Sequence, residues 1–253
     1  MKRSYYSGLM AISILALTAC GEAPEKPLEA DEVVTRAIEE AGGERFGESH
    51  IEFVFRDRAY SSHWENGQQV LKRITTTDSA VIVDTRKGEA FERTVGDSLV
   101  VVPDSMAGKY SRSVNSVHYF AYLPHGLNGR AVNRELLGIV ELDGKSYYKV
   151  KVTFEQEGGG EDYQDIFVYW FDTETFRPEF LAYEYFTDGG GLRFRQGYND
   201  RTVGGLKFMD YRNFKTEASV PVTALDSLFE LGQLEELSVI ELQNISVNQD
   251  NYN

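Results

Sequence analysis

The sequence predicts a mainly β, α+β protein in which one long curved antiparallel sheet of about eleven strands forms an incomplete barrel around an N-terminal helix. Three observations predict this fold. Alternating polar and apolar residues fill most of the chain after residue 50, as in half-buried strands. The connections are too short for parallel crossovers, so the strands must pair antiparallel. A sheet of this length has to curl, and the amphipathic segment before it is available to cover the concave face.

The N-terminal segment is predicted to direct export and not to belong to the fold. Lys2 and Arg3 precede the apolar run 8–19, which is too short for a membrane span of about 20 residues and is typical of a secretory signal peptide. The run ends in the letters LTAC at positions 17–20, which resemble a bacterial lipobox. This resemblance implies cleavage before Cys20 and lipidation of its thiol. The alternative is an ordinary signal peptide with a cysteine at the cleavage site.

The predicted organisation is a signal peptide at 1–19, a lipidated cysteine and tether at 20–30, and a single half-barrel domain at 31–253. The formal charge is −14, which disfavours nucleic acid and anionic lipid surfaces as partners. Attachment to a membrane must therefore come from acyl chains. Cys20 is the only cysteine, so neither a disulfide nor a thiolate metal site is expected.

The first helix is expected to begin at Asp31 as its N-cap and to end at Gly42-Gly43. It has one apolar stripe with spacings of three and four residues, formed by Val33, Val34, Ala37, Ile38 and Ala41. From residue 50 the period changes to two, and Asn66-Gly67 indicates a turn. Further strands are expected at 68–77, 79–85, 89–95 and 98–102.

A second helix is expected at 112–124, with Ser113 as its cap and Pro124 at its end. Asp143-Gly144 predicts a tight hairpin. A short helix near 224–231 is expected before the last strand. The strands of this half are expected at 136–142, 145–156, 163–172, 176–187, 191–199, 205–217 and 235–247.

Four unusual segments carry a family resemblance: AIEEAGGERF (37–46), SVNSVHYFAYLPHGLN (113–128), VTFEQEGGGEDYQD (152–165) and DGGGLRFR (188–195). Together with the strands between them, they resemble an uncharacterised family of lipoproteins from Gram-negative bacteria. The layout of a helix followed by a long antiparallel meander also resembles the LolA, LolB and LppX lipoprotein carriers. That resemblance implies a half-barrel with an apolar cavity for acyl chains. The protein is expected at the outer membrane, on its periplasmic face or at the cell surface. No cofactor is expected, because the sequence has neither a phosphate-binding loop nor a dinucleotide-binding fingerprint.

Several strands carry apolar residues on both faces, so they are either covered on both sides or line an apolar cavity. The residues expected to line the cavity are Phe53, Phe55, Val168, Trp170, Phe180, Leu192, Phe194 and Tyr198. Plain core packing is the alternative for each of them.

Polar residues near the glycines at 189–191 are candidates for the rim of the cavity. Arginines can hold a phosphate or carboxylate through two hydrogen bonds, although an outward charged face is the alternative interpretation. The rim candidates are Arg193, Arg195, Arg201 and Asp188. The acidic loop 155–165 has oxygen ligands but lacks the calcium-loop pattern, and a solvated hairpin is favoured. No metal site is predicted.

The sequence favours a non-enzymatic, lipid-anchored envelope protein that binds an acyl chain or lipoprotein lipid. One alternative is a protein-interaction module of the outer membrane or cell surface. A third hypothesis is a glycan or lipid hydrolase that uses Asp162, Asp165 or Glu184 with His118 nearby, although nothing in the sequence pairs these groups.

Overall fold

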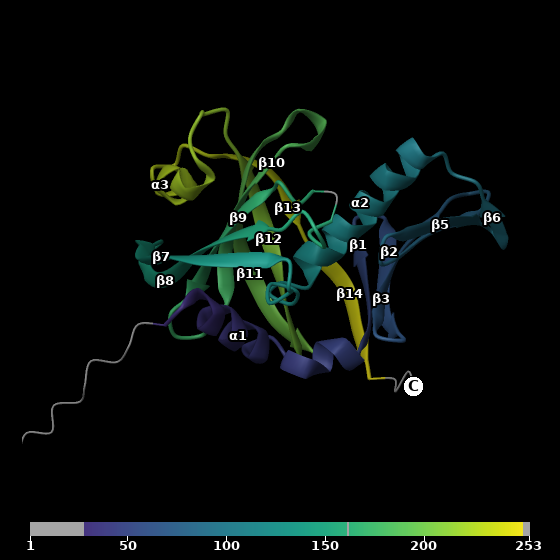
Figure 1. Ribbon diagram of the computed structural model, residues 1–253, viewed down its shortest axis with the longest axis horizontal. Helices are drawn as coiled ribbons and strands as arrows, with labels where there is room; N and C mark the ends of the chain where they lie inside the picture. Colours follow the sequence, from purple (N-terminus) through teal and green to yellow (C-terminus); the bar gives the residue numbers. More distant parts are fainter. Residues whose placement is uncertain (1–27, 161, 250–253) are drawn as a thin grey trace, which may run out of the picture.

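The computed structural model describes residues 28–160 and 162–249, which form two seven-stranded antiparallel sheets (Figure 1). The signal peptide and Cys20 therefore lie outside the described residues. The first sheet has the order β14-β1-β2-β3-β4-β5-β6. Its strands are β1 (His50–Phe55), β2 (Arg58–Glu65), β3 (Gln68–Thr76), β4 (Val81–Lys87), β5 (Ala90–Val95), β6 (Ser98–Val100) and β14 (Leu242–Asn248).

The second sheet has the order β13-β12-β11-β10-β9-β8-β7. Its strands are β7 (Val132–Leu142), β8 (Lys145–Phe154), β9 (Ile166–Asp172), β10 (Pro178–Tyr185), β11 (Gly191–Val203), β12 (Leu206–Lys215) and β13 (Glu235–Ile240). Only Glu241 separates β13 from β14, so the chain passes directly from one sheet into the other. The two sheets do not close into a barrel. Strand β6 forms the outer edge of the first sheet, and β7 forms the outer edge of the second.

This architecture confirms the predicted antiparallel, mainly β fold. Both predicted hairpin turns are present, since Asn66-Gly67 and Asp143-Gly144 have positive φ at both residues, as a type I′ turn requires. The strand number is higher than expected. The predicted strand 235–247 is divided at Glu241 into two strands of different sheets.

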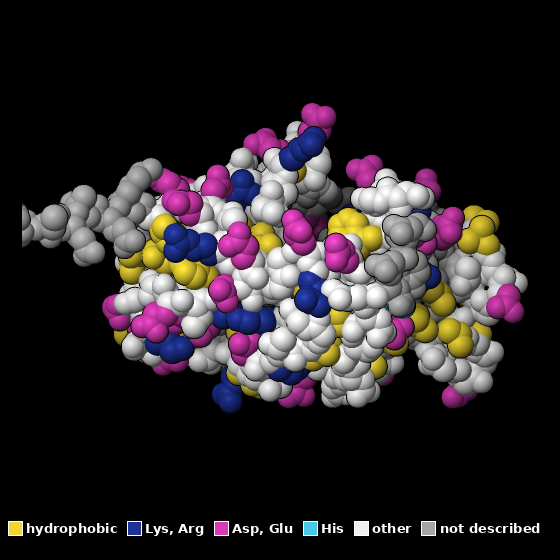
Figure 2. Space-filling view, turned by 90° about the horizontal axis from the view of Figure 1, so that it is seen from below, with side chains coloured by type: hydrophobic (Ala, Val, Ile, Leu, Met, Phe, Trp, Pro, Cys, Tyr) yellow, Lys and Arg dark blue, Asp and Glu magenta, His cyan; other side chains and the backbone are white. Residues whose placement is uncertain are grey.

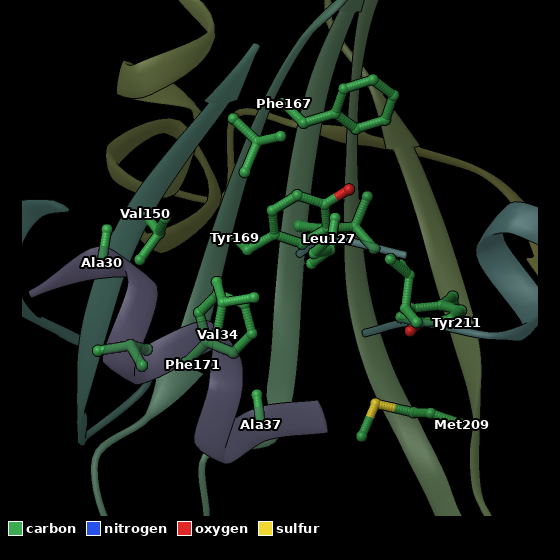
Figure 3. Packing of buried hydrophobic residues seen from close by; sticks show 14 residues of the cluster. Ala30, Val34, Ala37, Leu127, Val150, Phe167, Tyr169, Phe171, Met209 and Tyr211 are labelled. Carbon is green, nitrogen blue, oxygen red and sulfur yellow. The ribbon is translucent and has the colours of Figure 1, made fainter. Parts of the chain in front are cut away.

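Helix α1 (Ala30–Glu40) packs on the inner face of the second sheet, as the sequence predicts. Val34 and Ala37 face Tyr169 and Phe171 across this core (Figure 3). The prediction of Asp31 as the N-cap is wrong: the cap is Glu29, whose backbone N–H donates to the Glu32 carboxylate at 3.1 Å. Asp31 instead pairs with Arg134 of β7 at 2.5 Å.

Helix α2 (Asp104–Ala121) connects the two sheets and is longer than the predicted helix 112–124. It begins after Pro103, and Ser113 is therefore an interior residue and not the cap. One side of the helix packs on the first sheet, where Val114 and Ala121 join the apolar core of β1–β3. Hydrogen bonds reinforce this contact, because Arg73 of β3 donates to Ser113 at 2.7 Å and Arg86 of β4 donates to Asn115 at 2.8 Å.

The second sheet is covered on both faces. Helix α1 lies on its inner face, whereas the segment with the 3₁₀ turn η3 (Val222–Ala224) and helix α3 (Leu225–Glu230) lies on its outer face. Val222 and Leu225 bury a separate apolar cluster there. Two further 3₁₀ turns, η1 (Gly43–Glu48) and η2 (Thr187–Gly189), complete the described elements.

Candidate functional site

Three hollows surround the C-terminal half of α2. The first, of about 570 Å³, lies between α2 and the inner face of β8–β11. A smaller one of about 200 Å³ lies between α2, β11–β12 and the β13–β14 junction, and a third of about 560 Å³ opens between α1, α2 and β2–β3. The first two share Ser116, Phe120 and Arg195, so they adjoin each other at this helix.

The first hollow, called the aromatic hollow below, combines rings with cations. Its volume falls within the range of small-molecule sites. Four cations line it: Lys109, Arg112, Arg193 and Arg195. The wall is formed by six aromatic side chains, Tyr119, Phe120, Phe154, Phe167, Tyr183 and Tyr185.

Strand alternation positions the sheet side of this wall. Residues two apart on a strand share a face, so Tyr183 and Tyr185 of β10 lie beside Arg193 and Arg195 of β11. Phe167 of β9 pairs with Tyr183, and their rings stack with centroids 5.4 Å apart. These neighbours form a continuous polar-aromatic surface across three strands.

Helix α2 supplies the opposite side of the hollow. Tyr119 is tied to the sheet by a 2.5 Å hydrogen bond between its hydroxyl and that of Tyr169. Burial raises the pKa of both phenols, so both stay neutral. Phe120 packs its ring against Tyr183 at 5.3 Å.

The lining of the aromatic hollow also contains two carboxylates, Asp162 and Asp165. Burial, together with the charge of Asp162, raises the pKa of Asp165 to about 6. Asp165 accepts a hydrogen bond of 3.3 Å from the backbone N–H of Phe186. Part of the acidic loop thus lines this hollow. No group of three possible metal ligands occurs in the ranges that the structure covers.

The structure corrects the placement of most residues predicted to line the cavity. Val168, Trp170, Phe180 and Phe194 lie on the outer face of β9–β11, in the core under α3, and Leu192 packs against the same cluster. Their side chains point to the outer face of the second sheet, and this face is also covered. Trp170 donates to Asp226 of α3 at 3.2 Å, which fixes it in that core.

The other three candidates are dispersed. Phe53 lies in the core between the first sheet and α2, and Tyr198 donates to Glu241 at 3.0 Å. Phe55 lines the smaller hollow beside α2. The ligand contacts predicted for these residues stay predictions.

Of the rim candidates, Arg193 and Arg195 both line the aromatic hollow. They therefore lie on the inner face of the sheet and do not form the outward charged face that was the alternative interpretation. Arg201 is elsewhere: it pairs with Asp210 at 2.9 Å and donates to the carbonyl of Leu242 at 2.7 Å. The side chain of Asp188 is outside the described part of the structure. A clamp formed by three arginines is therefore not assembled.

The residues of the hydrolase hypothesis do not meet in one cleft. Asp162 and Asp165 line the aromatic hollow, whereas His118 faces the first sheet, with Nε2 3.1 Å from the carbonyl oxygen of Ser61. Glu184 lies between Tyr183 and Tyr185 on β10 and so points to the opposite face. His118 and Glu184 therefore lie outside the hollow that Asp162 and Asp165 line.

Comparison with known proteins identifies the family. A model of a family of unknown function, DUF6503, matches residues 64–242. The chain belongs to DUF6503. The matched range includes every residue that lines the aromatic hollow. No curated protein matches the sequence.

Solved structures similar to this DUF6503 protein share little sequence with it. A LolA superfamily protein from Nitrosomonas europaea has 14% identity and a TM-score of 0.48, covering 88% of this chain and 94% of that one. A DUF1329 family protein from Desulfovibrio piger has 9% identity, a TM-score of 0.47 and coverages of 87% and 92%. A putative outer-membrane lipoprotein-sorting protein domain from Vibrio parahaemolyticus has 11% identity and a TM-score of 0.40, covering 73% of this chain and 85% of that one.

Sequence reasoning missed several residues of the DUF6503 site. Tyr119 and Phe120 of α2 were not among its candidates, and their signal was an aromatic pair on the side of the helix away from Val114 and Ala121. Tyr183 was also missed, although it alternates with the outward Ala182. Within the described residues, no helix has the length and apolar character needed to span a membrane.

Proposed function

We propose that this protein is exported, is held at the outer membrane by a lipidated Cys20, and binds the apolar chain of a hydrophobic ligand in the aromatic hollow. An acyl chain or the lipid of a lipoprotein is the ligand class. No chemical step is assigned to the protein.

The single observation that carries the binding proposal is the aromatic hollow itself. A space of about 570 Å³ lies between α2 and the inner face of the second sheet, and six aromatic rings line it. Such rings provide large apolar contact areas, because each aromatic side chain can bury about 150–250 Å². Helix α2 is bound to the first sheet through Arg73 and Arg86, which leaves its other side beside the hollow.

Native mass spectrometry of residues 21–253, purified from bacteria without detergent, tests the binding proposal. We expect a bound species of lipid mass, which is then identified after extraction. Ser116→Trp should abolish it, because Ser116 is exposed and lines two of the hollows. Ser105→Trp is the matched control, since Ser105 is an exposed position in the first turn of the same helix. A bare wild-type protein that also binds no fluorescent fatty acid would refute ligand binding.

The lipid anchor is a separate part of the proposal. It is supported by the signal-peptide pattern before Cys20 and by the net charge of −14, which does not favour adsorption to anionic lipids. Full-length protein grown with radioactive palmitate should carry the label and sediment with outer membranes. Cys20→Ser should lose both properties. An unlabelled wild-type protein would refute lipidation.

Protein interaction is the second candidate function, and one surface favours it. The edge of the first sheet around β5 and β6 exposes apolar side chains, and hydrophobic groups are visible at the right-hand end of Figure 2, where Figure 1 places these strands. They are Val81, Val95, Leu99, Val100, Val101 and Met106. Exposed apolar side chains gathered at one end of a sheet are typical of contact with a protein partner. A photo-crosslinker at position 99 should capture a protein partner in cells, and loss of that crosslink on Val101→Lys would support this function.

A further inference from the structure

Arg195 is a buried cation that forms no ion pair in the part of the chain that the structure describes. Only 7% of the residue is exposed. Its Nη2 donates to the hydroxyl of Tyr183 at 3.1 Å, but Nε and Nη1 are buried without a partner. Its guanidinium carbon lies 3.7 Å from the centroid of the Phe120 ring. The ring gives some cation–π attraction but does not supply hydrogen-bond acceptors.

This arrangement is unfavourable without a counter-ion, because a buried charge needs both pairing and hydrogen bonds. Arg177 shows the contrast. It too is buried and has unpartnered nitrogens, but its charge is met by Asp200. Within the described ranges, Arg195 forms no ion pair, although two carboxylates, Asp162 and Asp165, line the same hollow.

The surroundings of Arg195 place polar and apolar contacts on different sides of it. Arg195 lines both the aromatic hollow and the adjoining hollow of about 200 Å³. In the smaller hollow its cross-strand neighbour is Asn213, whose buried Oδ1 also lacks a partner and whose Nδ2 donates to Ser238 at 3.2 Å. A ligand head group at this junction would meet the guanidinium of Arg195, while its chain would meet the aromatic wall.

We propose that Arg195 binds the anionic head group of an amphiphilic ligand, a carboxylate or a phosphate, whose apolar chain occupies the aromatic hollow. Nε and Nη1 each share one edge of the guanidinium with Nη2, which keeps a second N–H beside its bond to Tyr183, so two acceptor oxygens of an anion can bind along either edge. The inference rests on the proposed function, since it specifies the ligand of that same hollow.

Displacement of the neutral fluorescent probe N-phenyl-1-naphthylamine from residues 21–253 tests the proposal. The competitors are dodecanoate, dodecyl phosphate and the uncharged dodecanol, which share one chain. We expect the wild type to bind an anionic competitor about tenfold or more tightly than dodecanol, as for hydrogen bonds to a charged group. Whichever of the two anions binds more tightly distinguishes a carboxylate ligand from a phosphate ligand.

Arg195→Met should abolish the preference for the anion and keep the affinity for dodecanol. Arg212→Met is the matched control, because Arg212 lies on the neighbouring strand, is 57% exposed and lines none of the three hollows. It should keep the preference. A wild type that binds all three competitors equally, or an Arg195→Met variant that keeps the preference, would overturn the head-group proposal and leave chain binding intact. A wild type that binds neither probe nor competitor would overturn both.

Discussion

The two sheets each bury an arginine, and the two residues are equally hidden: Arg73 of β3 and Arg195 of β11 are both 7% exposed. Arg73 is fully engaged. Its Nε and Nη2 donate to Asp84 at 3.1 and 2.6 Å, and its Nη1 donates to Ser113 at 2.7 Å. Arg195 has one protein acceptor, the hydroxyl of Tyr183.

The difference separates a structural charge from one available to a ligand. Asp84 also accepts a hydrogen bond from Arg93 of β5 at 2.6 Å, so a single carboxylate connects β3, β4 and β5. Arg73 extends this connection to helix α2 through its hydrogen bond to Ser113. Among the described residues, Arg195 has no carboxylate partner of this kind and contacts only the Tyr183 hydroxyl and aromatic rings, including that of Phe120. A buried polar group left without partners in this way requires an explanation, and a bound anion provides one.

The largest effect on stability is expected for Asp84→Asn, which leaves Arg73 and Arg93 without their carboxylate partner. We expect the free energy of unfolding to fall by about 3–5 kcal/mol, the usual cost of removing one partner of a buried ion pair. Urea unfolding monitored by circular dichroism measures it. Asp97→Asn, at an exposed position, should change stability by less than about 0.5 kcal/mol. Equal small effects of both variants would show that the Asp84 pairs are not structural.

Acid should create an uncompensated cation between α2 and the first sheet, at His118 of the helix. Burial lowers the pKa of His118 to about 4, whereas the unfolded value is 6.5. The unfolded chain therefore binds the proton first, and stability is lost as pH falls from 6.5 to 4, by roughly 3 kcal/mol. Burial also lowers the pKa of His125 to about 4, which adds in the same direction.

Urea unfolding at pH 7 and pH 4 tests this effect, with His118→Phe as the variant. The variant should lose about half of the pH dependence, because His125 keeps the rest. Its stability at pH 7 should fall, since the hydrogen bond between the ring and a carbonyl oxygen is removed. An unchanged pH dependence would contradict the assignment to His118.

The matched substitutions Arg195→Met and Arg73→Met test directly whether the two buried arginines differ in their contribution to stability. We expect Arg195→Met to leave stability unchanged or to raise it by about 1–2 kcal/mol, because a buried charge without a partner is replaced by an apolar chain of similar length. Arg73→Met should destabilise, since Asp84 keeps only Arg93. Thermal melts of ligand-free protein distinguish them. Two losses of similar size would mean that Arg195 has a structural partner.

The sequence predicted much of the first-order fold, because its signals were local. Asn66-Gly67 and Asp143-Gly144 have the residues that the tight turns require, and the stripe of α1 fixes which side of that helix is buried. The division at Glu241 was not predictable in the same way. Strand alternation continues on both sides of it, and only the packing of the two sheets bends the chain there.

The site was harder to predict because the second sheet is covered on both faces. On β11, Phe194 and Arg195 point in opposite directions, and hydrophobicity favours Phe194 for an apolar cavity. The outer face, however, is buried by Val222 and Leu225, which follow β12 in the chain. Which face is concave depends on this long-range packing, so a local pattern of apolar residues does not contain the answer.

The smallest expected effect concerns the carboxylate that shares the aromatic hollow with Arg195. Burial and the charge of Asp162 raise the pKa of Asp165 from 3.8 to about 6, so the folded protein favours the protonated form. The pH dependence of stability has the opposite sign to that of His118: Asp165 stabilises the fold fully below pH 3.8, and this contribution is lost as pH rises through 6.

Asp165→Asn, with Asp97→Asn again as control, should therefore raise stability at pH 7 by roughly 1 kcal/mol after allowance for solvent screening. It should also bind dodecanoate a few-fold more tightly, because one negative charge near Arg195 is removed. Urea unfolding and probe displacement at pH 7 measure the two effects. A loss of stability would mean that the negative charge of Asp165 is favourable in the folded protein, since the Oδ1 of Asn can still accept from the Phe186 N–H.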